Sequence, residues 1–402
     1  MHKFFLTVLL IFMFTGVLSQ DTTVSFPDLV PCDKITPGSE QVHRYLPMIR
    51  DKRAGIAANH TSLVGKTHLV DTLLDLNIAI EKIFAPEHGF RGILDAGKNI
   101  RNSRDRISGI QIISLYGKHY KPTQRDLRNI EIMIFDMQDV GVRFYTYLST
   151  MIYIMEACAE NDIPLIILDR PNPNGFYIDG PVLEKEFRSF VGLHPVPVVY
   201  GMTLGEYARM ANGEKWLAGN LQCDLTVIPL TGYNHKMICK LPINPSPNLP
   251  NWISVYLYPS LALFEGTIMS VGRGTGRPFQ VIGHPGYLTG SFMFMPEARP
   301  GANDPKYQGE VCYGSNLTSY ALNFKNQPGK INLHWLKETY RYFGKTHRFF
   351  NSYFNYLAGN STLQEQIRTG TPADTIRNSW RKDIEAFKKI RKQYLLYEDF
   401  PD

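Results

Sequence analysis

Residues 83–92 read Ile83-Phe84-Ala85-Pro86-Glu87-His88-Gly89-Phe90-Arg91-Gly92, an apolar run that ends abruptly in charged and glycine-flanked positions. The preceding residues extend this run, so we predict a buried β-strand over Ile78–Ala85. A carboxylate and an imidazole at the end of a buried strand cost free energy to desolvate, and a packed core has no use for them. We therefore predict that this strand delivers Glu87 and His88 to a functional site.

The pattern of an apolar strand followed by a polar cluster recurs between residues 54 and 175. Segments with apolar residues at helical spacing separate the strands, which indicates βαβ units, a parallel sheet and an α/β fold. In such sheets ligands bind beyond the carboxyl ends of the strands, where all of these clusters fall. The clusters are Asn59-His60-Thr61, Glu87-His88, Tyr116-Gly117, Asp136-Met137-Gln138-Asp139 and Asp169-Arg170-Pro171-Asn172-Pro173.

The length of 402 residues exceeds what one hydrophobic core usually organises, so we expect two domains. The sequence composition changes at proline-rich residues 242–250 and glycine-rich residues 265–278. We predict a catalytic parallel-sheet domain over 45–260 and a smaller mixed α+β domain over 261–402. The net charge of +6 is scattered without long Lys/Arg runs, which argues against nucleic acid as a partner.

Residues 1–20 have the pattern of a secretory signal peptide. His2-Lys3 precede the apolar run Phe4–Phe14, which is too short to span a bilayer, and small residues follow. We expect export to the periplasm or the cell exterior without stable membrane insertion, a signal anchor being the alternative.

The five cysteines lie far apart without a Cys-x-x-Cys pair, so we expect neither a zinc site nor a dense disulfide framework. Cys223 and Cys239 are the nearest pair for a bridge. Neither a His-Glu-x-x-His nor a Gly-x-Ser-x-Gly motif is present. We expect no metal and no cofactor.

Glu87, His88 and Asp136 are the catalytic candidates. A carboxyl group in a partly apolar cleft has its pKa open to being raised, which suits Glu87 for general acid catalysis. His88 would orient Glu87 or bind substrate, and Asp136 follows its strand directly. The alternative for Glu87 is a surface turn with a capping carboxylate.

Substrate-binding candidates surround these residues. Aromatic faces beside an arginine suit a sugar ring that carries a carboxylate, and a glycine-rich loop with Arg273 suits an anion. Structural alternatives stay open, such as helix capping by Asp139 or a purely structural Asp169–Arg170 ion pair. The candidates are Asn59, His60, Arg91, Gln138, Asp139, Arg143, Tyr145, Asp169, Arg170, Asn172, Glu265 and Arg273.

Several long motifs together resemble one family, the exo-β-N-acetylmuramidases of the NamZ type. They include Pro86–Gly92, Ser114–Gly117, Phe135–Tyr147, Leu168–Pro173, Gly201–Glu206, Pro245–Asn248, Glu265–Thr267, Gly272–Thr275 and Tyr394–Tyr397. The resemblance implies a Rossmann-like N-terminal domain, a smaller C-terminal domain and a site between them. It also implies removal of terminal N-acetylmuramic acid from the non-reducing end of peptidoglycan fragments, with Glu87 at the position of the family's proposed catalytic glutamate. The chain departs from the family pattern at Asn174 and Val271.

The second catalytic group is left open by the sequence. Asp136, Asp169 and Glu265 all qualify, as does the 2-acetamido group of the sugar itself. Arg143, Arg170 or Arg273 would bind the lactyl carboxylate of muramic acid. The main rival interpretation is a secreted protein that binds muramic-acid-containing glycans without cleaving them. Oligomeric state and preferred aglycone are also open.

Overall fold

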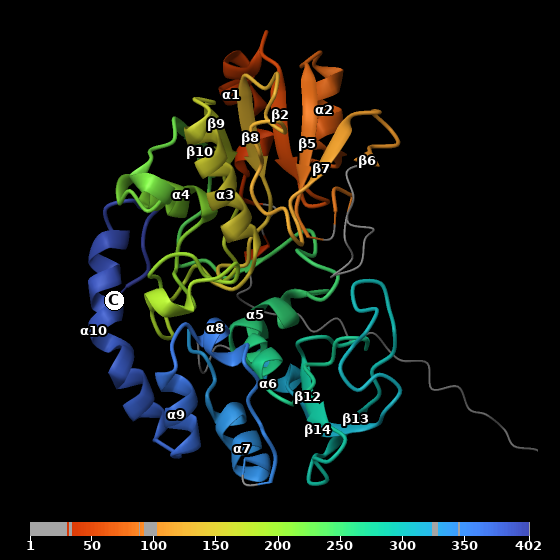
Figure 1. Cartoon of the computed structure of the whole chain (residues 1–402), viewed down its shortest axis with the longest axis vertical. Helices are drawn as coiled ribbons and strands as arrows, with labels where there is room; N and C mark the ends of the chain where they lie inside the picture. Colours follow the sequence, from red (N-terminus) through yellow and green to blue (C-terminus); the bar gives the residue numbers. More distant parts are fainter. Residues whose placement is uncertain are drawn as a thin grey trace, which may run out of the picture.

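A seven-stranded sheet forms the centre of the N-terminal lobe in the computed structural model, which describes residues 30–31, 34–87, 89–91, 103–323, 329–344 and 346–401 (Figure 1). The strand order is β10-β9-β8-β2-β5-β7-β6, and every pairing is parallel except that of β6 with β7. In that order the strands are Leu225–Ile228, Leu165–Leu168, Ile132–Asp136, Ala54–Ala58, Ile80–Ala85, Gln111–Ser114 and Ser103–Arg104. This sheet confirms the predicted α/β fold.

Helices cover both faces of the sheet (Figure 1). Helices α1 (Val42–Ile49) and α2 (Leu69–Asp75) pack on one face, against Ile56, Ile83 and Ile134 among others. Helices α3 (Tyr147–Glu160) and α4 (Leu204–Gly213) pack on the other face, against the strand residues that alternate with those. Because side chains alternate along a strand, each strand contributes to both cores.

The C-terminal lobe contains a small antiparallel sheet and several helices, which confirms the predicted mixed α+β character. Its sheet has the order β12-β14-β13, with strands Val281–His284, Cys312–Asn316 and Phe292–Phe294. The helices of this lobe are α5 (Trp252–Leu261), η5 (Ala262–Gly266), α6 (Thr318–Leu322), α7 (His334–Phe343), α8 (Phe354–Ala358) and α9 (Thr362–Arg368). Helix α10 (Ala373–Arg391) then runs back toward the N-terminal lobe (Figure 1).

Short elements connect these parts of the fold. The short strands are β1 (Val30–Pro31) paired with β11 (Cys239–Lys240), and β3 (Leu63–Val64) paired with β4 (Thr67–His68). The short helical turns are η2 (Gly38–Glu40), η3 (Lys185–Phe187) and η4 (Ala218–Asn220).

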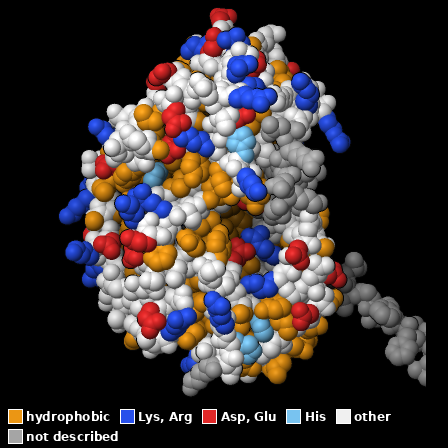
Figure 2. Space-filling model, viewed as in Figure 1, with side chains coloured by type: hydrophobic (Ala, Val, Ile, Leu, Met, Phe, Trp, Pro, Cys, Tyr) orange, Lys and Arg blue, Asp and Glu red, His pale blue; other side chains and the backbone are white. Residues whose placement is uncertain are grey.

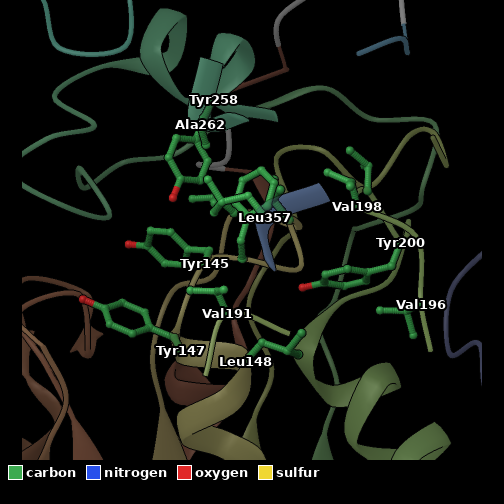
Figure 3. Close-up of a cluster of buried hydrophobic side chains, with 14 of the residues drawn as sticks. Tyr145, Tyr147, Leu148, Val191, Val196, Val198, Tyr200, Tyr258, Ala262 and Leu357 are labelled. Carbon is green, nitrogen blue, oxygen red and sulfur yellow. The ribbon is translucent and has the colours of Figure 1, made fainter. Parts of the chain in front are cut away.

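One hydrophobic cluster runs through both lobes. It joins Phe135 on β8 and Leu148 on α3 to Tyr258 on α5, Phe279 and Leu357 on α8. Figure 3 shows side chains of this cluster from both lobes meeting around Tyr145 and Tyr258. Apolar packing of this extent holds the lobes together and gives the space between them defined walls.

The cysteines that the structure describes are all buried and unpaired, so Cys223 and Cys239 do not form the bridge that their spacing left open. Across the described ranges, no helix is long and apolar enough to cross a membrane, and no three His, Cys, Asp or Glu side chains group in a way that could hold a metal ion. The predicted signal peptide over residues 1–20 lies outside these ranges.

Candidate active site

A cavity of about 380 Å³ lies where the two lobes meet. The space-filling view shows a hollow between the lobes with acidic and basic side chains at its edge (Figure 2). Residues from both lobes line it, among them Glu87, Tyr116, Tyr145 and Tyr147 on one side and Tyr258, Glu265, Arg273 and Tyr353 on the other. A concave site with mostly aromatic walls and a few convergent charges is the usual form of a small-ligand site.

Glu87 enters this cavity directly from the carboxyl end of β5, as its sequence position predicts. Burial raises the pKa of its carboxyl group, and the nearby charge of Glu265 acts in the same direction. Hydrogen bonds from the side chains of Tyr116 and Thr146 and the charge of Arg273 oppose that shift in pKa without cancelling it. A carboxyl group that retains its proton at higher pH is suited to donate it to a leaving group.

Glu265 and Arg273 form a bidentate ion pair on the opposite wall. The distances are 2.6 Å from Arg273 Nε to Glu265 Oε1 and 3.1 Å from Nη2 to Oε2. The guanidinium also stacks on the ring of Phe279, 4.9 Å from its centroid. Within the described part of the chain Nη1 has no hydrogen-bond acceptor, so one nitrogen of Arg273 remains available to a ligand.

Aromatic rings form the floor of the cavity. Tyr145 donates a hydrogen bond to the carbonyl of Pro245 at 2.8 Å, and its ring lies edge-on to Tyr147 with centroids 4.9 Å apart (Figure 3). The Tyr147 hydroxyl and the Asn59 Nδ2 are buried, and neither atom makes a hydrogen bond of good geometry within the described residues. The two side chains nevertheless lie close enough to interact with each other, so Asn59 supports the Tyr147 hydroxyl from behind the cavity wall.

The structure thus brings four of the predicted site residues to the cavity wall: Glu87, Tyr145, Glu265 and Arg273. Asn59 lies behind Tyr147 and does not line the cavity. His88 lies outside the described residues. The remaining predicted residues bind other parts of the protein.

Asp136 forms a buried ion pair with Arg170 in place of the predicted catalytic role. Arg170 Nε and Nη2 lie 2.5 and 2.9 Å from the two Asp136 oxygens, and the Asp136 side chain is inaccessible to solvent. Arg170 also donates to the hydroxyl of Ser39 and to the carbonyl of Leu63. Because both charges are satisfied inside the protein, we assign Asp136 and Arg170 a structural role.

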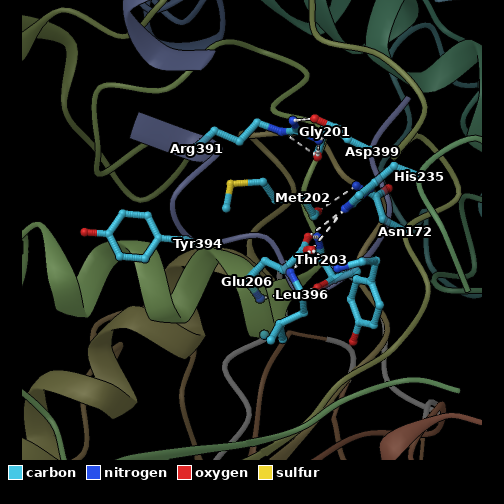
Figure 4. Close-up of polar contacts among 12 residues, drawn as sticks. Asn172, Gly201, Met202, Thr203, Glu206, His235, Arg391, Tyr394, Leu396 and Asp399 are labelled. Atoms are coloured by element: carbon cyan, nitrogen blue, oxygen red, sulfur yellow. Dashed lines mark hydrogen bonds and ion pairs between the residues drawn. The ribbon is translucent and has the colours of Figure 1, made fainter. Parts of the chain in front are cut away.

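Asp169 anchors α4 and the C-terminal tail. Its carboxylate accepts hydrogen bonds from the Thr203 hydroxyl, the Gly205 amide and the Tyr397 hydroxyl, all within 2.9 Å. Beside it, Glu206 accepts from His235 and from the backbone amide of Leu396 (Figure 4). The alternative of a structural Asp169–Arg170 ion pair is not found, since Arg170 pairs with Asp136 instead.

Arg143 is fully buried and serves as an internal support. Burial lowers the pKa of its guanidinium to about 9. A Cβ atom at Gly359 would lie 2.5 Å from Nη2 of Arg143, and the positive φ of 85° at this position also favours glycine. The guanidinium donates to the carbonyls of Pro181, Val196, Leu357 and Ala358. These contacts replace the predicted binding of substrate.

The other substrate-binding candidates also make internal contacts. Arg91 binds Asp71 and Asp105 in two bidentate pairs. Gln138 donates to the backbone carbonyls of Asp139 and Pro171, Asn172 donates to that of Met202, and His60 lies 2.9 Å from the carbonyl of Asn244. These side chains hold the loops at the strand ends in place.

Asp139 couples folding to pH. Burial raises the pKa of its carboxyl group to about 6, against hydrogen bonds from Tyr200 and the Gly141 amide. The folded state therefore holds the proton more tightly than the unfolded state, and the stability from this group is present below pH 4 and lost as pH rises through 6. As pH rises from 4 to 7, we expect the free energy of unfolding of Asp139→Asn to increase by about 3 kcal/mol relative to that of the unaltered protein.

Denaturant unfolding at pH 4, 5.5 and 7 measures this difference, with Asp304→Asn at an exposed position as the matched control. Parallel pH curves for the unaltered protein and Asp139→Asn would contradict the assignment.

Most of the aromatic cavity wall was missed by sequence reasoning. Tyr116 sits in a recognised strand-end cluster, and its position before Gly117 was the available signal. Tyr120, Phe190 and Tyr353 come from loops and a helix end that are distant in sequence. No local pattern connects these residues, because only the tertiary fold brings them together.

Comparisons with known proteins agree with this architecture. The model of the N-terminal domain of exo-beta-N-acetylmuramidase NamZ matches residues 54–253, and the model of its C-terminal domain matches residues 256–397. The chain is 39% identical over 375 residues to peptidoglycan beta-N-acetylmuramidase NamZ of Bacillus subtilis, covering 88% of this chain and 89% of that protein.

Two crystal structures of DUF1343 family proteins from Bacteroides fragilis share the fold. One is 45% identical with a TM-score of 0.83, and the other is 27% identical with a TM-score of 0.78. Both comparisons cover 91% of this chain and 99% of the other chain. With both lobes matched and a glutamate presented in the cavity between them, the chain belongs to the exo-β-N-acetylmuramidase NamZ family of glycoside hydrolases.

Proposed function

We propose that this protein is an exported exo-β-N-acetylmuramidase that releases terminal N-acetylmuramic acid from the non-reducing end of peptidoglycan fragments. The observation that carries the proposal is Glu87, a carboxyl group with a raised pKa that faces the Glu265–Arg273 pair across one cavity. The name of the Bacillus subtilis relative supports the same reaction and substrate. The signal-peptide pattern of residues 1–20 supports export.

The size of the cavity supports cleavage at a chain end. A volume of about 380 Å³ is near the lower limit for small-molecule sites, which favours the end of a glycan over its interior. A longer glycan has to leave this space through the mouth of the cavity. The bond between the enclosed sugar and the next residue would then lie beside Glu87.

In the proposed reaction Glu87 donates its proton to the glycosidic oxygen as the bond to C1 of the muramic acid breaks. Water supplies the hydroxyl group that ends on C1, and its remaining proton restores the acid. Glu265 is the one sequence-predicted partner carboxylate that lines the cavity, whereas Asp136 and Asp169 are engaged elsewhere. The 2-acetamido group of the sugar is the alternative internal nucleophile.

Arg273 is proposed to bind the lactyl carboxylate, the group that distinguishes muramic acid from N-acetylglucosamine. Nη1 of Arg273 would bind that carboxylate while Nε and Nη2 hold Glu265, and a lysine cannot make both sets of contacts from fixed positions. We expect Arg273→Lys to lower kcat/KM for a muramic acid glycoside by about 100-fold. The ratio of kcat/KM on this glycoside to kcat/KM on the N-acetylglucosamine glycoside should fall as well.

The matched control is Arg277→Lys, an exposed position in the same glycine-rich loop, which should leave both activities as they are. Equal losses on the two glycosides would show that Arg273 serves only to hold Glu265.

The test of the proposed function is release of 4-nitrophenol from its β-N-acetylmuramic acid glycoside, with the N-acetylglucosamine glycoside alongside. Cleavage confined to the muramic acid compound is the expected result. Binding of the muramic acid compound without any release would instead identify a glycan-binding protein that retains the cavity but not the chemistry.

A further inference from the structure

A stack of aromatic rings stands beside the cavity on the N-terminal lobe. Tyr120 and Phe190 line the cavity, and their rings stack with centroids 4.0 Å apart and an interplanar angle of 24°. Tyr153 on α3 lies to the side of this pair with a nearly parallel ring, 6.2 Å from Phe190 at 5° and 6.5 Å from Tyr120 at 19°. All three side chains are half-buried, so the stack keeps part of its surface in solvent.

The opposite side of the cavity also presents an aromatic ring. Tyr353, at the start of α8 in the C-terminal lobe, lines the cavity and is 40% exposed. The carboxylates of Glu265 and Glu87 both raise the pKa of its hydroxyl beyond the main effect of burial, and Tyr120 contributes as well. Tyr353 is therefore close to the reacting groups and faces the Tyr120 side of the site.

The exposure of these rings needs an explanation. A packed core buries its large aromatic side chains, whereas aromatic surface exposed around a cavity marks a ligand-binding groove. A pyranose ring offers a flat face of C–H groups that packs on an aromatic ring while its hydroxyl groups stay in water. Two partly exposed aromatic walls of one cavity therefore fit a sugar residue that packs between them and keeps one edge in solvent.

The position of Glu87 gives the direction of the bound glycan. A general acid must reach the oxygen between the cleaved sugar and the leaving group, so the leaving group lies on the side of Glu87. Tyr116 hydrogen-bonds to Glu87, and Tyr120 and Tyr353 line the same cavity. A leaving group that extends from Glu87 within this cavity therefore comes into reach of both aromatic walls.

We propose that Tyr120, Phe190 and Tyr353 form an aglycone subsite that binds the sugar residue on the leaving-group side of the scissile bond, with Tyr153 supporting the stack. This inference rests on the proposed function and adds to it a preference for glycan fragments over glycosides of small alcohols. The sugar that follows the terminal muramic acid is recognised through its ring face. Its binding therefore depends more on the area of the aromatic rings than on the hydroxyl group of any one tyrosine.

The experiment compares two substrates that share the muramic acid residue. The disaccharide in which N-acetylmuramic acid is β-1,4-linked to N-acetylglucosamine fills the subsite, whereas the β-fluoride of N-acetylmuramic acid has no aglycone. We expect Phe190→Leu and Tyr120→Leu each to lower the ratio of kcat/KM on the disaccharide to kcat/KM on the fluoride by about tenfold. Tyr120→Phe keeps the ring face and should retain the ratio.

Tyr342→Leu is the matched control. Tyr342 is 39% exposed and packs edge-on against Tyr287 with centroids 4.8 Å apart, but it belongs to α7 and does not line the cavity. Its replacement should leave the ratio unchanged. If the leucine variants of the stack fail to fold, Tyr353→Leu on the opposite wall carries the same expectation.

The two proposals fail in different ways. Absence of turnover of both the disaccharide and the fluoride by the unaltered protein would overturn the proposed function. If the unaltered protein turns over both substrates and the folded leucine variants keep its ratio, the aglycone subsite alone is overturned.

Discussion

Glu87→Gln is expected to lower kcat on the disaccharide of N-acetylmuramic acid β-1,4-linked to N-acetylglucosamine by about 10³-fold, with little change in KM. Glutamine has nearly the same shape and retains the contact with Tyr116, so binding of the sugar is preserved. It carries no acidic proton, so the glycosidic oxygen departs without protonation. The effect is therefore confined to the chemical step.

The leaving group and the pH profile identify the role of Glu87. Fluoride leaves with less need of a proton than a sugar alcohol, so the Gln variant should lose much less activity on the β-fluoride than on the disaccharide. Because burial raises the pKa of Glu87, activity of the unaltered protein should be present below that pKa and fall as pH rises through it.

That basic limb should disappear in Glu87→Gln, and Glu310→Gln at an exposed position is the matched control. Near-normal turnover of the disaccharide by Glu87→Gln would remove Glu87 from the mechanism.

Asp136→Asn is expected to lower the free energy of unfolding by about 3–5 kcal/mol. The substitution leaves the guanidinium of Arg170, whose side chain is 9% exposed, without its carboxylate in the interior. A buried charge that loses its partner is still removed from water but no longer gains the attraction that offsets the desolvation free energy. The same change should leave the kcat of the folded fraction intact, because Asp136 does not line the cavity.

Denaturant unfolding and turnover per folded molecule measure both parts of this expectation. The double variant Asp136→Leu/Arg170→Met removes both charges and should be less destabilised than Asp136→Asn alone. A stable but inactive Asp136→Asn would return Asp136 to the catalytic machinery.

The pattern of apolar strands made the sheet and the position of Glu87 predictable. Which strand-end side chains point into the cavity depends on the face of the sheet on which each one lies. Ile132 and Ile134 on β8 face α1 and α2, so the two-residue period of a strand turns Asp136 to that side as well. There it meets Arg170. The position of a polar residue at a strand end is therefore not enough to place its side chain in the cavity.

Arg143 illustrates a second limit of sequence patterns. Beside two tyrosines it has the local appearance of a carboxylate-binding residue, yet its partners are carbonyls that follow it by 38 to 215 positions. Glu265 and Arg273 were accessible to sequence reasoning because a glycine-rich loop with a charge is a local signal. The aromatic walls were not, since packing between the lobes assembles them.

The contacts of the C-terminal tail have a consequence for biosynthesis. Tyr397 and Leu396 supply hydrogen bonds to the buried carboxylates of Asp169 and Glu206, which precede them in the chain by 228 and 190 positions. During translation the N-terminal lobe leaves the ribosome long before these partners exist, although domains usually fold as they emerge. Before residues 396 and 397 are added, Asp169 has the Thr203 hydroxyl and the Gly205 amide as donors but lacks the Tyr397 hydroxyl, and Glu206 lacks the Leu396 amide. The N-terminal lobe therefore reaches its full set of internal hydrogen bonds only after the C-terminal tail has packed on it.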